Sequence, residues 1–509
     1  MIMAGRRMIR DTVMLTLMQL ILDTASLMMN SFITQRLGAP AVGALALMGS
    51  FLGLAGILSN GNAFLCTSRL VSEELAKEGG SPEGILMHGI KLCMVLSGAV
   101  SVMIYMLSGE ISARFFSGAE MEGAVRFMPA ALFSGAVCAC IKGYFNALRR
   151  PAVTAAADIL EFAVRSGAIV VMTLLTSAGA EEICRILVVS MISGNGVSVI
   201  FLLGAYLKLR VRRKGSRSSM TLRGYARYAF PIMGGSLLTA LLSSTNDALI
   251  PVCLRQHGST AATALAQFGI FEAIVIPTLF FPSVVLCSMS GIIVSEAARA
   301  SAAGNRERIR SITGRLTEYT IIYAVIASAV LIRFGPDIGV QLGGGAEAGK
   351  MIQAIAPVVP FIYMEIVLEA LIKGMGLQGF SSLNYLAEYV IRISAVLILV
   401  PRAGFWGIAV SYYASNVFGN TMRLIKVLRY TGTRIKIAES IILPIIYAFL
   451  TMNLPEILLG RRTAVRNGLQ YVIMYSILWI ILYSLSIFII KNRRGSVGDK
   501  GKILYDINK

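Results

Sequence analysis

Long apolar runs recur along the whole chain, each followed by a short polar or basic stretch. The most apolar are residues 84–108, 168–207, 228–254, 320–334, 393–401, 440–452 and 469–490. A helix needs about 20 mostly apolar residues to cross a bilayer, and it satisfies its own backbone polar groups there. The pattern predicts an all-α polytopic membrane protein with about fourteen transmembrane helices. Their expected centres lie near residues 23, 53, 96, 137, 163, 195, 240, 277, 321, 364, 390, 415, 446 and 480.

Composition and charge agree with this pattern. Of the 509 residues, 56% are hydrophobic and only 15% are charged, although the net charge is +20. The basic residues gather in short stretches at 207–219, 298–310, 423–436 and 491–502. This distribution is typical of cytoplasmic loops under the positive-inside rule, and it argues against nucleic acid as a partner. We therefore expect a plasma-membrane protein with both termini in the cytoplasm.

One loop departs from the rule. Residues 460–468 carry three arginines and would lie outside in this arrangement, whereas 118–123 and 335–349 are acidic or glycine-rich and suit the outside. The placement of the last two helices is therefore the part of the topology that the loop charges do not support.

The chain contains an internal repeat. Four short matches occur in the same order, pairing residues 36–51 with 255–271, 70–80 with 293–305, 140–148 with 371–379, and 160–165 with 387–392. Such a series predicts two copies of one six-helix unit. Because six is even, both copies insert with the same orientation, related by a pseudo-twofold axis along the membrane normal. This plan is typical of transporters that rock two lobes about a central site.

The repeat gives an expected domain organisation of two lobes with additions. Its parts are an N-lobe of helices 1–6 at 1–207, a basic cytoplasmic linker at 208–223, a C-lobe of helices 7–12 at 224–430, helices 13–14 at 431–490, and a basic cytoplasmic tail at 491–509.

Two stretches resemble a known family. Residues 141–171 contain Gly-Tyr-Phe, a short basic turn and a Glu-x-x-x-Arg helix, as in polysaccharide exporters of the stage V sporulation protein B type. Residues 244–285 are similar to the seventh and eighth helices of the same group. The resemblance covers roughly residues 10–430. It implies the multidrug/oligosaccharidyl-lipid/polysaccharide (MOP) exporter superfamily, and fourteen helices suit its sporulation-protein and lipid II flippase branches.

The charge pairs Glu161/Arg165 and Glu388/Arg392 are repeat-related and lie in apolar segments. Their i,i+4 spacing places each Glu beside its Arg on one helix face, in the favourable order. Two interpretations stay open: a buried structural clip, or a cavity-facing pair that opens to meet an anionic head group. Lys142 is also repeated, as Lys373, and we expect both to snorkel to the interface.

Other polar residues inside apolar segments are functional candidates by default, although each could also be a satisfied interhelical hydrogen bond. The family's cleft is lined by helices 1, 2, 7 and 8. The resemblance therefore favours Asp23, Asn30, Asn246, Asp247 and Glu272 as substrate-binding residues. Helices 1, 2 and 8 carry no arginine like those of the lipid II flippases, so a phosphate would be met by Lys91, Arg165 or Arg392, by helix N-termini, or by a co-bound cation.

The sequence motifs indicate neither an enzyme nor a metal site. Residues 343–350 match Gly-x4-Gly-Lys, but position 351 is Met where a phosphate loop needs Ser or Thr. The chain has two histidines, and its seven cysteines show no metal-ligand spacing. We expect no enzyme activity, no cofactor and no metal site.

The sequence therefore predicts a secondary transporter, acting as a monomer, that flips a lipid-linked oligosaccharide by alternating access. Its expected partners are that lipid-linked sugar, the surrounding membrane lipids and a coupling cation. Two alternatives stay open. The acid-rich, base-poor cleft also suits a cation-coupled multidrug exporter, and a membrane scaffold for cell-wall or spore assembly would tolerate neutral replacements of the cleft acids.

Overall fold

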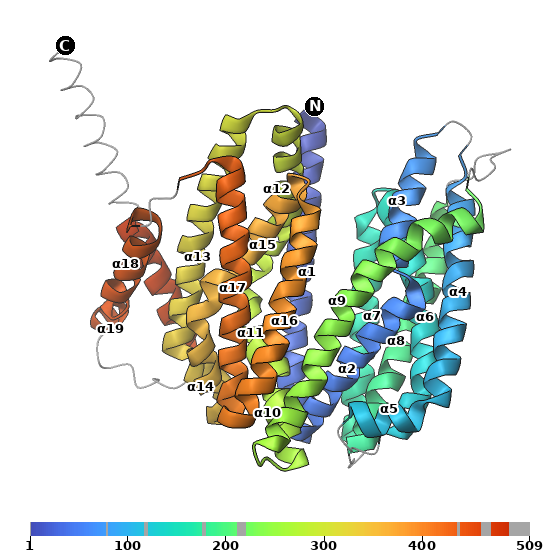
Figure 1. The fold of residues 1–509 in the computed structure, drawn as a ribbon, viewed down its shortest axis with the longest axis horizontal. Coiled ribbons are helices and arrows are strands. Elements are labelled where there is room, and N and C mark those ends of the chain that lie inside the picture. The colour runs from blue at the N-terminus through green and yellow to red at the C-terminus, as the bar shows by residue number, and fades with distance from the viewer. Residues whose placement is uncertain are drawn as a thin grey trace. The chain divides into compact units, whose positions relative to one another are not determined.

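The computed structural model describes residues 2–77, 80–116, 121–175, 180–210, 220–434, 438–459 and 470–487. All regular elements in these ranges are helices (Figure 1). The first part of the chain forms α1 (Ile2–Leu37), α2 (Ala39–Asn60), α3 (Ala63–Leu75), α4 (Pro82–Met106), α5 (Ser108–Phe115), α6 (Glu122–Ala147), α7 (Pro151–Leu175), α8 (Ala180–Leu209), α9 (Leu222–Gln256) and α10 (Ala261–Ile270).

The remainder continues the helical pattern. It forms η1 (Phe271–Val275), α11 (Ile276–Phe280), η2 (Phe281–Ser283), α12 (Val284–Ala302), α13 (Arg306–Gln341), α14 (Gly345–Ile355), η3 (Ala356–Val358), α15 (Val359–Gly374), α16 (Gln378–Ala403), α17 (Phe405–Thr431), η4 (Ala438–Ile442), α18 (Leu443–Thr451), α19 (Leu454–Leu459) and a last helix at Gln470–Ile487. Each of the predicted helix centres falls inside one of these segments.

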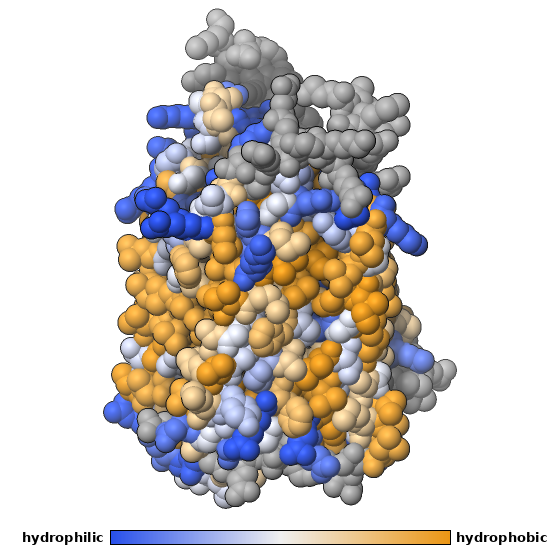
Figure 2. Space-filling view, turned by 90° about the vertical axis from the view of Figure 1, so that its right-hand side faces the viewer, coloured by the Kyte–Doolittle hydropathy of each residue, from blue (hydrophilic) through white to orange (hydrophobic). Residues whose placement is uncertain are grey.

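The predicted membrane character is confirmed. Within the described ranges, eleven helical segments are long and apolar enough to cross a bilayer. Large apolar side chains such as Val95, Val102 and Met106 of α4 face outward. Figure 2 shows a broad apolar belt on one face of the molecule, with polar side chains gathered towards both ends. An outward apolar surface bounded in this way suits lipid rather than water.

The chain divides into two compact units. Unit 1 comprises Met1–Ile274 with Tyr389–Ser411, and unit 2 comprises Val275–Glu388 with Tyr412–Lys509. This division by compactness places α9 and α10 with the first helices, whereas the division by repeat at 1–207 and 224–430 remains a prediction. The linker is described only at 208–210 and 220–223. The arginine-rich loop 460–468 and the tail 491–509 lie outside the described residues.

In unit 1, α2 packs against α4, α6, α9 and α10. The contact with α10 is very close, because a Cβ added at Gly43 would lie 1.8 Å from the carbonyl oxygen of Leu265. Small residues allow such backbone approach between membrane helices. The packing holds the middle of α2 beside α9 and the end of α10, where the polar residues of the site lie.

The second predicted helix is broken into α2 and α3. Gly61 and Asn62 both adopt left-handed backbone conformations, with φ of 57° and 58°. The Asn60 side chain accepts the backbone N–H of Asn62 at 2.8 Å, and the Asn62 amide donates to Ser236 of α9 at 2.7 Å. These two intramembrane asparagines thus satisfy the break in the helix.

Candidate functional site

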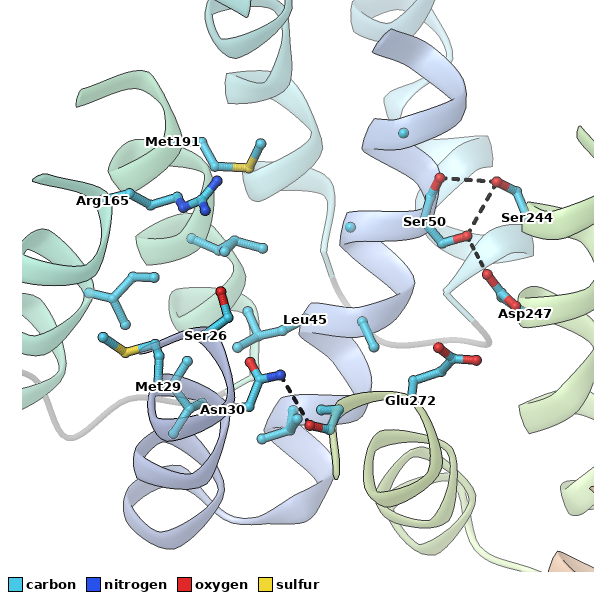
Figure 3. Close-up of a pocket in the computed structure, with 18 of the residues that line it drawn as sticks. Ser26, Met29, Asn30, Leu45, Ser50, Arg165, Met191, Ser244, Asp247 and Glu272 are labelled. Carbon is cyan, nitrogen blue, oxygen red and sulfur yellow. Dashed lines mark hydrogen bonds between the residues drawn. The ribbon is translucent and has the colours of Figure 1, made fainter. Parts of the chain in front are cut away.

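A cavity of about 660 Å³ opens inside unit 1. Segments of α1, α2, α7, α8, α9 and η1 line it, and most of the lining side chains are apolar or small (Figure 3). Four of the predicted substrate-binding residues reach it: Asn30, Arg165, Asp247 and Glu272. A largely apolar cavity with a few convergent polar groups is typical of small-molecule sites.

One wall of the cavity is acidic. Asp247 on α9 accepts a hydrogen bond from the Ser50 hydroxyl of α2 at 2.7 Å and one from Asn246 at 3.3 Å. The Ser244 hydroxyl in turn donates to the backbone carbonyl of Ser50 at 3.0 Å. The second carboxylate, Glu272, lies on the same wall (Figure 3). Ser50, which is itself bonded to Ser244, holds Asp247 in place, and Glu272 also lines the cavity.

Glu272 lies on an element that sequence periodicity did not anticipate. It belongs to η1, a single π-helical turn between α10 and α11. Asn30 of α1 donates to the carbonyl oxygen of the next residue, Ala273, at 3.0 Å. π-Turns inside α-helices occur frequently at functional sites, because they offset the backbone and redirect a side chain.

The facing wall carries Arg165 on α7 (Figure 3). Its guanidinium lies over the Phe162 ring at 5.7 Å, and its nearest carboxylate among the described residues, Glu161, is 3.9 Å away. Lys142 of α6 is the closer partner of that carboxylate at 2.8 Å, and it also contacts Asp158 at 2.7 Å. Glu161 is therefore held mainly by Lys142, while Arg165 keeps its hydrogen-bond donors available to a ligand.

Lys142 does not snorkel to the interface as expected. Its side chain is only 16% exposed, whereas that of Lys373 is 52% exposed and lies 3.4 Å from Glu369. Lys142 lies five residues before the end of α6, and Lys373 lies one residue before the end of α15. The difference of four residues is about one helical turn. It places Lys142 beside the carboxylates of α7 and leaves Lys373 at a helix end.

In unit 2, Arg423 of α17 donates a hydrogen bond to the carboxylate of Glu388 at 3.0 Å. Arg423 is fully buried, and its guanidinium also lies 3.5 Å from Glu365 and 3.6 Å from Glu369. The sequence predicts a basic loop at 423–436, but its first part, 423–431, belongs to α17, which ends at Thr431. Three carboxylates nearby compensate this buried charge, which explains why an arginine is tolerated there.

The other predicted site residues lie away from the cavity surface. Asp23 accepts a hydrogen bond from Gln19 at 2.8 Å on α1, and Lys91 is exposed on α4. Asn246 is buried next to Asp247. Arg392 lies over the Tyr389 ring at 5.4 Å and interacts electrostatically with Asp247 and Glu272.

Sequence reasoning missed the serines of the cavity. Ser26, Ser50 and Ser244 line it together with the predicted residues. Serine is common in transmembrane helices, where it bonds to the preceding turn, so its presence alone carries little signal. The i,i+3 spacing of Ser244 and Asp247 on one helix face was the available sign.

Comparison with known proteins places the fold. No protein-family model matches the sequence. The chain is 20% identical over 317 residues to stage V sporulation protein B of Bacillus subtilis (strain 168), and the match covers 60% of this chain and 61% of that relative. The chain thus matches less than two thirds of the length of this curated relative.

Solved structures extend the likeness over most of the chain. The lipid II flippase MurJ in an inward closed conformation matches with a TM-score of 0.70 at 12% identity, covering 94% of this chain and 98% of MurJ. An inward-facing multidrug resistance MATE family transporter of the MOP superfamily matches with a TM-score of 0.58 at 16% identity, covering 81% and 94%. A MOP superfamily transporter from Pyrococcus furiosus matches at 0.53 and 15%, covering 82% and 96%. The chain is a multi-pass membrane protein whose described residues have the all-helical fold of these transporters, so the predicted fold class is confirmed.

Proposed function

We propose that the protein is a secondary transporter that flips a lipid-linked oligosaccharide from the cytoplasmic to the outer leaflet. The observation that carries this proposal is Arg165, a cationic side chain at the surface of a largely apolar cavity, whose neighbouring carboxylates on α7 are held by Lys142. A guanidinium with available donors suits the oxygens of a phosphate. The MOP fold and the distant likeness to stage V sporulation protein B support the same class of activity.

The proposed cycle is alternating access. The sugar-phosphate head enters the cavity from the cytoplasmic side while the isoprenoid tail stays in lipid, and the protein then opens outward. A membrane potential that is negative inside assists the outward movement of a negative head by about 2.3 kcal/mol per charge per 100 mV. This energy source requires no nucleotide. Protonation or cation binding at Asp247 or Glu272 would reset the empty carrier.

A second candidate function is a cation-coupled multidrug exporter. The observation that favours it is the acidic wall, where Asp247 and Glu272 face the same cavity. Intramembrane carboxylates of this kind attract cationic substrates or coupling ions. This function needs the acids but not Arg165, whereas the flippase needs both, so Arg165 is the residue that separates the two candidates.

The first experiment is native mass spectrometry of the gently purified protein, followed by flipping in proteoliposomes. A bound isoprenoid diphosphate with a sugar, and transfer of that lipid between leaflets, are the expected results. Arg165→Gln should abolish the transfer, whereas Arg402→Gln, at an exposed position of α16, should not. Cation-driven efflux of a drug without lipid transfer would instead establish the exporter. Transfer of neither substrate, with cavity variants unchanged in a cellular assay, would favour a scaffold.

A further inference from the structure

The charges of the cavity lie on two separate walls. Arg165 projects from α7, while Asp247 and Glu272 project from α9 and η1 on the facing side (Figure 3). Building on the proposed function, we propose that the transported head group is zwitterionic, with an anionic phosphate that binds Arg165 and a cationic amine that binds Glu272.

The basic wall provides the phosphate subsite. Arg165 makes no hydrogen bond with any residue in the described ranges, and its side chain is one-third exposed. Lys142 holds Asp158 and Glu161 at 2.7 and 2.8 Å, so these carboxylates do not occupy the guanidinium at hydrogen-bonding distance. The planar fork of five donors can therefore bind two oxygens of one phosphate.

The acidic wall provides the amine subsite. The carboxylate of Asp247 already accepts hydrogen bonds from Ser50 and Asn246, whereas no described residue donates one to Glu272. Both carboxylates share the positive charge of Arg392. One cation for two carboxylates leaves Glu272 without a cation of its own, and at membrane depth its charged form is favoured only when a cation binds beside it. An ammonium group on the ligand would supply the missing positive charge at Glu272.

Ligands with one kind of charge fit this cavity less well. A purely anionic head would place further negative charge near Asp247 and Glu272. A purely cationic ligand would leave the Arg165 guanidinium desolvated and unpaired, which costs free energy. Apolar side chains such as Leu45 and Ile169 also line the cavity and give the uncharged part of the head group a surface.

The test compares two probes that differ only in the charge of one amine. Isoprenoid-diphosphate glucosamine carries a free amine, and its N-acetyl form does not. Both are titrated against the full-length protein in nanodiscs by native mass spectrometry, and both are tested for flipping. We expect about tenfold tighter binding of the free-amine form by the wild type. Glu272→Gln should abolish this preference by weakening the free-amine form alone.

Matched variants separate the two subsites. Arg165→Gln should weaken both probes by about tenfold or more. Glu182→Gln on α8 and Arg402→Gln on α16 remove the same charges at exposed positions and should leave both affinities unchanged. Equal binding of the two probes by the wild type, with both flipped, would overturn the zwitterion proposal and leave the proposed function intact.

A phospholipid could supply the same chemistry as a lipid-linked aminosugar. If neither sugar lipid binds or is flipped, the proposed function fails, and phosphatidylethanolamine is compared with its N-acetyl derivative in the same titration. A preference for the free amine that Glu272→Gln abolishes would support the zwitterionic site with a phospholipid as its ligand. No preference in this second pair would overturn the zwitterion proposal as well.

Discussion

At the scale of single residues, the site depends on which cation holds which carboxylate. Lys142 bridges Asp158 and Glu161 and thereby prevents Glu161 from closing fully on Arg165, four residues further along the same helix. A partly buried carboxylate without a partner takes the nearest cation available. Lys142 therefore acts as a positioning residue for Arg165.

This role predicts the effect of Lys142→Met. Glu161 should turn to Arg165, so the affinity for an isoprenoid diphosphate should fall by about tenfold, or about 1.4 kcal/mol. Adding Glu161→Gln to the same chain removes the competing charge and should restore most of the affinity. The titration by native mass spectrometry measures both changes. An unchanged affinity in the single variant, or no recovery in the double variant, would show that Lys142 does not control Arg165.

At the scale of elements, a single side chain joins three helices of unit 2. Arg423 of α17 contacts Glu365 and Glu369 of α15 and Glu388 of α16, and it stacks on the Tyr385 ring at 4.3 Å. A planar guanidinium can bond to several carboxylates and stack at the same time, which an ammonium group cannot do.

Removing this residue should destabilise the helices that it joins. We expect Arg423→Ala to lower the free energy of unfolding by about 3–5 kcal/mol, because two buried carboxylates and the partly buried Glu365 lose their common cation. Arg423→Lys keeps the charge but loses the stacking and the fork, so it should fall between the wild type and Ala. Thermal unfolding in detergent measures the order, and exposed Arg402→Ala should match the wild type. A melting temperature unchanged in Arg423→Ala would disprove the structural role.

Glycine contacts also set the packing of elements. A Cβ added at Gly43 of α2 would overlap the backbone of Leu265 in α10, whereas one added at Gly56 of the same helix would meet nothing within 4 Å. Both substitutions by Ala raise helix propensity by a similar amount. Any difference between them therefore reports the contact between helices.

We expect Gly43→Ala to destabilise the protein by about 1–3 kcal/mol or more, since overpacking forces the helices apart. Gly56→Ala should be neutral or stabilising by up to about 1 kcal/mol. Melting temperatures of the two variants in one detergent provide the comparison. Equal melting temperatures would mean that α2 and α10 do not approach as closely as described.

The residues that the sequence pairs as a repeat can be compared at the same scale. Glu161 and Glu388 each lie ten residues after the first residue of their helix, α7 and α16, and the following aromatic residue stacks with the repeated arginine in both. Gly143 and Gly374, from the repeated Ile-Lys-Gly, each lie close to the backbone of another helix. The two copies keep these contacts but differ in the cation that holds the glutamate, which is Lys142 in one and Arg423 in the other.

At the scale of the whole molecule, the loop charges predict the orientation in the membrane. If both termini are cytoplasmic, the chain crosses the membrane an even number of times. With the basic loops in the cytoplasm, the turn between α13 and α14 then lies outside. A fluorescent protein fused to the C-terminus should therefore fluoresce, and alkaline phosphatase inserted after Gly343 should be active. The reverse pattern would contradict the predicted topology and would place the basic loops outside.

The sequence by itself determined the helical membrane fold and the positions of the helices, and it predicted the repeat, because hydrophobic length and ordered matches are one-dimensional properties. It also supplied four charged or amide residues of the cavity, since polar groups inside apolar runs stand out. Only the tertiary structure decided that Lys142 and not Arg165 is the closer partner of Glu161, that Arg423 is buried in unit 2, and that Ser50 and Ser244 support Asp247. These relations depend on distances between helices and on local breaks such as η1, and neither follows from spacing along one helix.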